Sequence, residues 1–219
     1  MRDRNAPLTQ ADIGTLAWDK MGGLLPALVQ DGRTGRMLML GYMNREALAA
    51  TLDTSLATFF SRSRQRLWQK GETSGNQLIV RGLFSDCDND ALLVLADPNG
   101  PTCHLGTPSC FAAELTGPAW LSELSAIIAE RARSGDPLSY TRRLLDEGPE
   151  RIGKKIGEEG VEVALAGVSR DSAGCAEEVA DLIYHVSVLM EARGFGWEDV
   201  IARLQERHAK AVNAPTASS

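Results

Sequence analysis

The spacing of hydrophobic residues changes character near the middle of the chain. Up to about residue 111, short apolar runs alternate with turns rich in Gly, Asp, Asn and Pro, which is typical of β-strands. Beyond residue 120, apolar residues recur every three or four positions, as on helices that bury one face. The pattern predicts two domains: a β-rich α+β domain at residues 1–114 and an all-α helical bundle at residues 115–219.

The first domain is expected to form a small sheet with one helix. Apolar runs at 25–30 and 36–42 flank a Gly-containing turn and predict a β-hairpin. Asn44 is a candidate N-cap for a helix that reaches about Leu52. The remaining expectations are an irregular arm up to about Leu16, strands at 57–61, 77–84 and 91–96, a loop at 61–76 and a turn at 97–100.

The second domain is expected to consist of helices that follow a linker at Gly117-Pro118. Leu121, Leu124 and Ile128 share one helical face, so the first helix begins near residue 121. The expected helices are one from Leu121 to a break at Asp136-Pro137, a short one capped by Ser139 and closed by Gly148-Pro149, long ones over 152–168 and 173–192, and a last one from Trp197 into a polar tail after Asn213.

The composition is that of a soluble globular protein. No run approaches the roughly 18 apolar residues that a membrane-spanning helix needs. The arginine-containing start lacks the apolar core of a signal peptide. The sequence therefore indicates a cytoplasmic protein without a membrane partner, and in that compartment clustered cysteines more often bind metal or catalyse than form disulfides.

The net charge of −6 belongs entirely to the second half of the chain. Up to Phe111 there are 11 basic and 11 acidic residues, whereas the rest of the chain has 12 basic and 18 acidic ones. Nucleic-acid binding needs a basic face and is therefore disfavoured. The acidic helices either gather divalent cations or form an ordinary solvated surface, and composition leaves both interpretations open.

Three of the four cysteines gather in a short part of the first domain. Cys87, Cys103 and Cys110 are soft ligands that favour zinc, and three protein ligands leave one tetrahedral position open for water. An open position indicates a catalytic site, whereas buried cysteines that only pack are the alternative. His104, beside one of these cysteines, suits either a fourth ligand or a general acid and base.

Three aspartates alternate around the first of these cysteines. If the chain is extended here, the carboxylates of Asp86, Asp88 and Asp90 share one side. Three carboxylate oxygens suit a hard cation such as magnesium, which cysteines do not hold. A solvated turn without metal is the alternative interpretation.

A basic loop with hydroxyls and glycines lies upstream at 61–76. Guanidinium groups pair with phosphate, glycines let backbone N–H groups approach it, and an aromatic ring can stack on a base. An exposed basic loop without a ligand is the alternative. The candidate substrate-binding residues are Arg62, Ser63, Arg64, Trp68, Lys70, Thr73 and Ser74.

These motifs together resemble phosphoribosyl-AMP cyclohydrolase of histidine biosynthesis. The resemblance runs from about residue 24 to 111 and is carried by FSRSRQRLWQKGETSGN, SDCDND and CHLGTPSCF in that order. It implies hydrolytic opening of the purine ring of phosphoribosyl-AMP between N1 and C6, with His104 as the proton shuttle for the attacking water. It also implies a dimer in which cysteines of both subunits meet at one zinc, so that Cys87 acts across the interface. The implied metal ligands are Cys87, Cys103 and Cys110 for zinc, and Asp86, Asp88 and Asp90 for magnesium.

Carboxylates also gather on two predicted helices of the second domain. Glu158, Glu159 and Glu162 occupy one broad stripe of the first helix. Glu178 and Asp181 share a face of the next helix. Like charges at this spacing repel unless a cation lies between them, and two facing helices can hold a divalent metal. A solvated acidic face is the alternative.

Basic residues and glycines flank this acidic run. Lys154 and Lys155 suit phosphate oxygens of a substrate that a magnesium ion would also bind. Gly157 and Gly160 each cost a helix about 1 kcal/mol relative to Ala. The two glycines hint at the close approach of another helix or of a ligand.

The segments KKIGEEGVE and EVADLIYH resemble phosphoribosyl-ATP pyrophosphohydrolase, within the all-α nucleoside-triphosphate pyrophosphohydrolase superfamily. The resemblance covers about residues 121–209. His185 fits the motif without an assigned role, and Cys175 is expected only to pack. The implied roles are magnesium binding for Glu158, Glu159, Glu162, Glu178 and Asp181, and phosphate binding for Lys154 and Lys155.

The two resemblances predict a bifunctional hydrolase that uses zinc and magnesium and binds nucleotides. The second domain would remove pyrophosphate from phosphoribosyl-ATP, and the first would open the ring of the product, so domain order is opposite to reaction order. The rival enzyme is a nucleotide-cleaning pyrophosphohydrolase whose first domain binds a partner through structural zinc. A zinc-dependent nucleic-acid-binding module is disfavoured, because the cluster has no fourth cysteine and the first half is neutral. A zinc deaminase is disfavoured, because its H-x-E and P-C-x-x-C motifs are absent.

Overall fold

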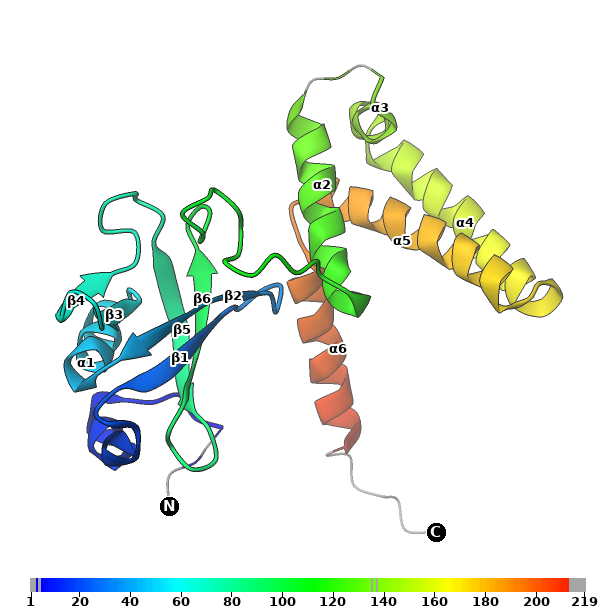
Figure 1. Ribbon diagram of the computed structural model, residues 1–219. Helices are drawn as coiled ribbons and strands as arrows, with labels where there is room; N and C mark the ends of the chain where they lie inside the picture. Colours follow the sequence, from blue (N-terminus) through cyan, green and yellow to red (C-terminus); the bar gives the residue numbers. More distant parts are fainter. Residues whose placement is uncertain (1–2, 4, 135, 137, 213–219) are drawn as a thin grey trace, which may run out of the picture. The chain divides into compact units, whose positions relative to one another are not determined.

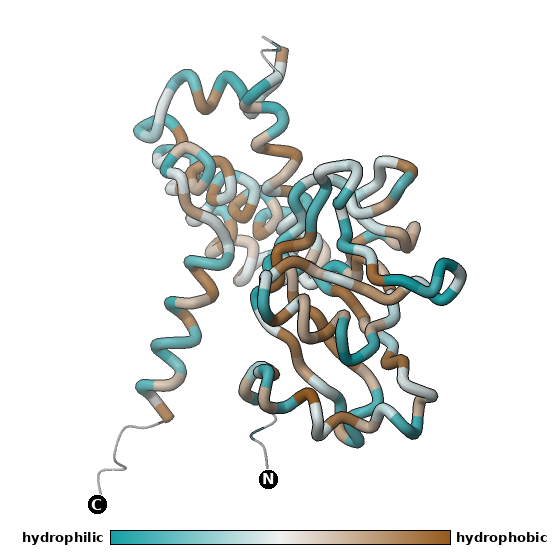
Figure 2. The backbone as a smooth tube through the Cα atoms, turned by 90° about the vertical axis from the view of Figure 1, so that its left-hand side faces the viewer, coloured by the Kyte–Doolittle hydropathy of each residue, from teal (hydrophilic) through white to brown (hydrophobic). Residues whose placement is uncertain are grey.

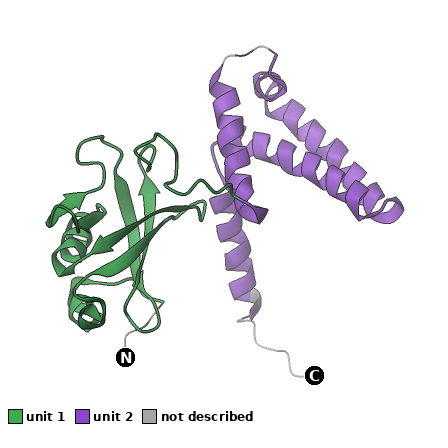
Figure 3. Cartoon of the chain, in the orientation of Figure 1, with its two compact units in different colours: residues 1–115 green, residues 116–219 purple. Residues whose placement is uncertain are grey.

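The computed structural model describes residues 3, 5–134, 136 and 138–212. It divides into two compact units, Met1–Leu115 and Thr116–Ser219 (Figure 3). Pro137 of the expected helix break, the first residues of the expected arm and the tail from Asn213 lie outside the described residues. Hydrophobic residues recur along strands and helices in short stretches (Figure 2), and no described helix is long and apolar enough to cross a membrane.

A four-stranded sheet forms the centre of the first unit (Figure 1). The strands are β1 (Leu25–Asp31), β2 (Met37–Met43), β5 (Leu78–Ser85) and β6 (Leu92–Pro98), in the order β2-β1-β6-β5. The predicted hairpin is confirmed, since β1 and β2 are antiparallel. β1 pairs with β6 in parallel and β6 with β5 antiparallel. Alternate residues of β1 are fully buried, as expected for a strand with one face on the core.

The predicted helix and an additional small hairpin flank this sheet. Helix α1 (Arg45–Thr54) begins at Asn44, whose side chain accepts a hydrogen bond from the backbone N–H of Ala47 at 2.8 Å, as predicted for an N-cap. Strand β3 (Thr58–Ser61) pairs with β4 (Arg66–Gln69), so the expectation of a continuous loop at 61–76 is wrong. The strand β4 forms because Trp68 packs against Phe59 of β3, with ring centroids 5.1 Å apart.

The N-terminal segment is more ordered than the expected irregular arm. Two 3-10 helices, η1 (Gln10–Thr15) and η2 (Trp18–Met21), follow one another. Trp18 is 1% exposed, and its indole N–H donates to the carbonyl of Ile13 at 2.7 Å. The segment is therefore fixed to the core, which also includes Leu25, Met43 and Phe59.

The second unit contains only helices among its described elements. They are η3 (Gly117–Ala119), α2 (Trp120–Ser134), α3 (Tyr140–Glu147), α4 (Pro149–Ser169), α5 (Ser172–Arg193) and α6 (Trp197–Val212). Helices α4 and α5 form a long antiparallel hairpin (Figure 1). The buried core is small and consists of Ile128, Leu144, Ile152 and Val188, with partly buried neighbours. The predicted helical class and the predicted β-rich first unit are both confirmed.

Candidate functional sites

Two of the three clustered cysteines line a cavity of about 510 Å³ in the first unit. His104 lies on the same wall as Cys103 and Cys110. Four of the seven candidate substrate-binding residues of the basic segment also line it, namely Trp68, Lys70, Thr73 and Ser74. The cavity therefore combines thiols, an imidazole and phosphate-suited groups in one space.

Backbone and hydroxyl contacts with strand β2 hold this cysteine segment in place. The hydroxyl of Ser109 donates to the carbonyl of Met37 at 2.7 Å, and the backbone N–H of Cys110 donates to Leu38 at 2.8 Å. The backbone N–H of Cys103 donates to the carbonyl of Thr107 at 3.0 Å and closes a tight turn. Cys110 is thus positioned by the edge strand of the sheet, and Cys103 by the turn that precedes it.

The two thiols differ in their electrostatic surroundings. Hydrogen bonds from the backbone N–H of Leu105 and from the side chain of Thr107 lower the pKa of the Cys103 thiol. Burial and the neighbouring Cys103 raise the pKa of the Cys110 thiol. A lowered pKa favours the thiolate form that metal ions bind, so Cys103 is the better prepared ligand of the two.

Cys87 does not join the other two cysteines. It is exposed on the loop between β5 and β6, and its Sγ lies 3.9 Å from the carboxylate of Asp88. Within the described residues, the three thiols form no group whose ligand atoms all lie within 4.8 Å of one another. A single chain therefore brings together two of the three predicted zinc ligands.

The basic segment is shaped by one glycine. Gly71 has a φ of +86°, and a Cβ there would lie 2.5 Å from the backbone of Asn76, so only glycine fits the turn.

Arg62 lies over the ring of Tyr42, with 3.9 Å from its guanidinium carbon to the ring centroid. Arg62, Ser63 and Arg64 are not among the residues that line the cavity.

The three aspartates converge, but on a turn and not on extended chain. The carboxylate of Asp86 accepts hydrogen bonds from the backbone N–H groups of Asp90 at 3.0 Å and Ala91 at 3.2 Å. Asn89 adopts a left-handed conformation with a φ of 62°. The expectation of an extended segment is thus wrong, because the Asp86 side chain closes the loop. Ligand oxygens of Asp86, Asp88 and Asp90 nevertheless lie within 4.8 Å of one another.

A lysine that the sequence did not single out contacts this aspartate group. The ammonium group of Lys20, on η2, pairs with the carboxylates of Asp88 and Asp90. Hydrogen bonds with these carboxylates raise the pKa of Lys20, and the Lys20 contact lowers the pKa of Asp88. No sequence signal joins residue 20 to residue 88, since only the fold brings η2 to this loop.

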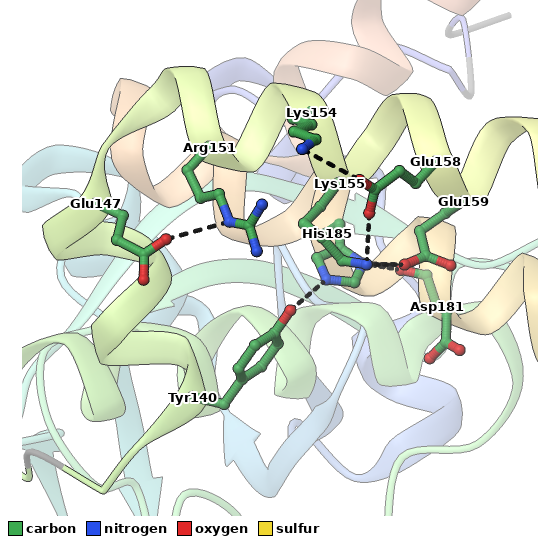
Figure 4. A network of polar contacts seen from close by, with 9 residues as sticks. All are labelled: Tyr140, Glu147, Arg151, Lys154, Lys155, Glu158, Glu159, Asp181 and His185. Carbon is green, nitrogen blue, oxygen red and sulfur yellow. Dashed lines mark hydrogen bonds and ion pairs between the residues drawn. The ribbon is translucent and has the colours of Figure 1, made fainter.

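A second carboxylate group lies between helices α4 and α5. Oxygens of Glu159, Glu178 and Asp181 lie within 4.8 Å of one another, and Glu159 is only 5% exposed. Glu158 instead turns outward, and its carboxylate accepts a hydrogen bond from Lys155 at 2.9 Å (Figure 4). The fold thus brings three of the five predicted carboxylates close together.

Glu162 lies next to this group, although it is exposed. A hydrogen bond with Glu159 and the charge of Glu159 raise the pKa of Glu162. Burial acts to raise the pKa of Glu159, but hydrogen bonds from Lys155 and Glu162 outweigh it and lower that pKa. The crowding of carboxylates is the electrostatic condition that a divalent cation relieves.

Basic side chains border the helical group on several sides. Lys155 Nζ lies 3.1 Å from Glu159 Oε1, and Lys154 Nζ lies 3.9 Å from Glu158. Arg170 at the end of α4 pairs with Glu178, a contact that the sequence did not predict. A Cβ at Gly157 or Gly160 would meet nothing within 4 Å outside its own helix backbone and chain neighbours, so among the described residues the expected close approach of another helix is not found.

A buried histidine and a tyrosine complete the polar network in Figure 4. The Nδ1 atom of His185 lies 2.9 Å from the carbonyl of Asp181 and 3.6 Å from Glu159 Oε1. Its Nε2 atom lies 3.1 Å from the hydroxyl of Tyr140 on α3. The sequence places His185 one helical turn after Asp181, which indicated that the two lie close together. Nothing in the sequence indicated that Tyr140 belongs to this network.

Family models and curated relatives match both units. The model described as phosphoribosyl-AMP cyclohydrolase matches residues 39–112, and the one described as phosphoribosyl-ATP pyrophosphohydrolase matches residues 121–208. The chain is 50% identical over 204 residues to the histidine biosynthesis bifunctional protein HisIE of Photobacterium profundum, covering 90% of this chain and 99% of the relative. It is 52% identical to the HisIE protein of Xanthomonas axonopodis pv. citri, with 93% and 98% covered.

A third relative has the same name and matches a similar share of the chain. The histidine biosynthesis bifunctional protein HisIE of Yersinia pestis is 49% identical over 204 residues, which cover 93% of this chain and all of the relative. Identity at this level over nearly complete chains extends through both units in the same order. The chain therefore belongs to the HisIE family of bifunctional histidine-biosynthesis enzymes, which join a phosphoribosyl-AMP cyclohydrolase domain to a phosphoribosyl-ATP pyrophosphohydrolase domain.

Proposed function

We propose that the two hydrolytic activities are divided between residues 1–114 and 115–219 and act in the reverse of their order along the chain. Residues 115–219 release pyrophosphate from phosphoribosyl-ATP, and residues 1–114 open the purine ring of the resulting phosphoribosyl-AMP between N1 and C6. The observation that carries this division is the separation of donor types: thiols and an imidazole line a cavity in one unit, and carboxylates converge in the other.

Cys103 and Cys110 would hold zinc in the first unit. Their donor chemistry fits zinc, and the lowered pKa of Cys103 supports a thiolate ligand. When bound, zinc supplies a water that is activated as a nucleophile near neutral pH. His104 is exposed and lines the same cavity, so it can take up and return a proton without rearrangement of the core.

A homodimer would complete the set of thiols. Cys87 is exposed and lies outside the cavity of its own chain, which leaves its side chain available to another copy. In the proposed dimer, Cys87 of the partner subunit joins Cys103 and Cys110. The proposal accounts for a predicted three-cysteine site of which one chain assembles two members.

The basic segment would hold the substrate of the ring-opening step. Lys70, Thr73 and Ser74 line the cavity beside the thiols and offer a charge and two hydroxyl donors to a phosphate. Trp68 presents an aromatic surface in the same cavity. Arg62, Ser63 and Arg64 lie on the adjoining turn, from which they would reach a phosphate outside the cavity.

The Asp86, Asp88 and Asp90 group would bind magnesium near the ring-opening site. The donor set fits, because three carboxylates of one loop lie within 4.8 Å of one another. Asp86 supports the turn and could contribute its second oxygen to a metal, since one oxygen accepts the backbone hydrogen bonds. The ion pairs of Lys20 with Asp88 and Asp90 would have to break when the ion binds.

Glu159, Glu178 and Asp181 would hold magnesium in the helical unit, with Glu162 beside them and Glu158 at the outer edge. Magnesium held there would supply a Lewis acid for cleavage of the phosphoanhydride. Lys154 and Lys155 would neutralise phosphate oxygens, since both ammonium groups border the carboxylates. Pairing with Glu158 and Glu159 holds Lys155 in place before substrate binds.

A cytoplasmic location would suit this chemistry, because a reducing compartment keeps metal-binding thiols free. The four cysteines are free in the structure.

Product analysis of the purified chain tests this function directly. Incubation with phosphoribosyl-ATP, zinc and magnesium should release pyrophosphate first and ring-opened product later. Ordinary nucleoside triphosphates are the control substrates, because the rival nucleotide-cleaning enzyme would hydrolyse them at least as well. Preference for the ordinary triphosphates, or a zinc-loaded chain that never opens phosphoribosyl-AMP, would count against the proposal.

The division between units is tested by supplying each substrate separately. Asp181→Asn keeps the size of the side chain but removes a charge from the proposed helical magnesium site. It should stop pyrophosphate release from phosphoribosyl-ATP and leave the opening of supplied phosphoribosyl-AMP intact. Loss of both activities in a folded variant would contradict two independent sites.

A further inference from the structure

His185 is a buried polar residue next to the proposed magnesium ligands of the helical unit. It is 5% exposed, as is Glu159. A buried imidazole needs hydrogen-bond partners for both ring nitrogens, and this ring has them on two different helices. Nδ1 faces the carbonyl of Asp181 and the carboxylate of Glu159, whereas Nε2 faces the hydroxyl of Tyr140 (Figure 4).

These contacts fix which ring nitrogen donates. The carbonyl of Asp181 can only accept, so the Nδ1 atom at 2.9 Å must carry the proton. In the neutral ring Nε2 is then an acceptor, and the Tyr140 hydroxyl at 3.1 Å donates to it. The ring cannot flip without placing a C–H group against each of these oxygen atoms.

We propose that His185 is a positioning residue for the magnesium ligands of the pyrophosphohydrolase site, and that Tyr140 fixes its ring. The Nδ1–H group donates to the backbone carbonyl of Asp181, and Nδ1 lies 3.6 Å from the carboxylate of Glu159 on the facing helix, so the buried ring packs beside that carboxylate. A group fixed beside a metal ligand, and bonded to the backbone of another, limits how those ligands can move before the ion arrives. The inference rests on the proposed function, because it takes the carboxylates between α4 and α5 as the magnesium site.

Lys155 also contacts Glu159, but it has a different position. Its ammonium group lies 3.1 Å from Glu159 Oε1 and 2.9 Å from Glu158, and its side chain is 23% exposed. A substrate phosphate can draw this ammonium group away from Glu159. His185, with a side chain 6% exposed, stays packed beside the carboxylate in either case.

The chain offers a matched control for the link between α3 and α5. The hydroxyl groups of Thr141 and Tyr184 lie 2.8 Å apart and join the same two helices one residue further along. No hydrogen bond of Tyr184 reaches a carboxylate of the site among the contacts described. Tyr184→Phe and Tyr140→Phe each remove one oxygen from an α3–α5 contact. The ring of Tyr184 packs against His185 and Tyr140, and Phe retains that ring, so only Tyr140→Phe removes a hydrogen bond to His185.

Magnesium affinity of the full-length chain is the measurement that tests this inference. Calorimetric titration with magnesium alone would be run for every variant in a background of Asp88→Ala and Asp90→Ala, so that the loop keeps only one of its three aspartates. The variants are Tyr140→Phe, Tyr184→Phe, His185→Asn and His185→Gln. His185→Asn keeps an N–H donor near the position of Nδ1, whereas His185→Gln carries its amide further out, near the position of Nε2.

His185→Gln should weaken magnesium binding by about 10- to 100-fold, the range for loss of a group that orients a metal ligand. Tyr140→Phe should weaken it by about 10-fold, at the lower end of that range. His185→Asn should recover most of the affinity, and Tyr184→Phe should leave it unchanged. The magnesium concentration for half-maximal pyrophosphate release should shift in the same order, with similar rates at saturating magnesium.

Equal affinity in His185→Asn and His185→Gln, or equal losses in Tyr140→Phe and Tyr184→Phe, would overturn the inference. If the His185 variants fail to fold, the two tyrosine variants decide, because each removes only one oxygen atom. The titration needs no substrate, so failure of the proposed function would appear separately, as a wild-type chain that binds magnesium at α4 and α5 but releases no pyrophosphate.

Discussion

The two acidic groups of this chain reach similar compactness by different means. Asp86, Asp88 and Asp90 belong to one loop, whose shape is set by hydrogen bonds within six residues of sequence. Glu159 meets Glu178 and Asp181 only because two long helices pack side by side (Figure 1). The first group is a local structure, and the second is a product of tertiary packing.

The surroundings of the two groups differ accordingly. The loop group is partly exposed, and its charge is balanced from outside by Lys20. The helical group has a buried member, Glu159, that pairs with Lys155 and packs beside the buried ring of His185. A change in the loop should therefore act mainly on the turn itself, whereas a change between the helices should act on ligand alignment and metal affinity.

The largest effect is expected from changes that distinguish the buried glutamate from its exposed neighbour. Glu159→Gln should lower pyrophosphate release by about 100-fold or more, because even indirect partners of metal ligands contribute 10- to 100-fold. Glu158→Gln should lower it by less than about 10-fold, since this residue forms an exposed pair with Lys155. Steady-state rates of pyrophosphate release at saturating magnesium measure both effects.

The comparison between Glu158 and Glu159 has its own control. Opening of supplied phosphoribosyl-AMP should stay at the wild-type rate in both variants. Equal losses of pyrophosphate release in the two variants would contradict the claim that Glu159, and not Glu158, belongs to the magnesium site.

A smaller effect is expected when the loop turn is disrupted. Asp86→Ala removes the acceptor of two backbone hydrogen bonds, each with a net contribution of about 0.5–1.5 kcal/mol. The free energy of unfolding of the first unit should fall by about 1–3 kcal/mol, as measured by denaturant titration with Trp fluorescence.

Asp86→Asn distinguishes the role of this side chain in the turn from the role of its charge in binding magnesium. An Asn side-chain oxygen can still accept both backbone N–H groups, so stability should remain near the wild-type value. Magnesium affinity of the loop should nevertheless fall, since one charge is lost. Equal destabilisation by Ala and Asn would show that these hydrogen bonds do not set the shape of the loop.

The smallest effect is expected at Lys20. Lys20→Met keeps the aliphatic stem and removes the ammonium group that competes with a cation for Asp88 and Asp90. Magnesium affinity of the loop should rise by about fivefold, the order expected when one unit charge no longer has to be drawn away from a carboxylate about 4 Å from it in water. Titration in a background of Glu159→Gln and Asp181→Asn isolates the loop, and a fall in affinity would mean that Lys20 organises the carboxylates and does not compete.

The difference between the two groups also explains how much could be predicted from sequence. The loop aspartates were identifiable because they alternate within one short segment, although the turn that Asp86 closes was mistaken for extended chain. Lys20 could not be found, because its approach depends on the packing of η2. The short strand β4 was missed since only Leu67 and Trp68 mark it.

The sequence motif identified the carboxylates of the helical unit, but it did not show which of them point toward the common site. Ile152, Ile156 and Glu159 follow one another at positions i, i+4 and i+7, so Glu159 continues the inward stripe of α4. Glu158 is turned away by one residue and meets solvent and Lys155. The stripe was visible in the sequence, but Tyr140 was not, because its contact with His185 depends on the angle of α3.

Phosphoribosyl-ATP turnover by the Cys103→Ser variant tests the central claim most directly. This change removes the thiol best prepared for zinc and leaves the carboxylates of the helical unit intact. The account predicts that pyrophosphate is released at the wild-type rate while phosphoribosyl-AMP accumulates and no ring-opened product forms. Ring-opened product at the wild-type rate, or loss of pyrophosphate release in the folded variant, would contradict two separate sites acting in that order.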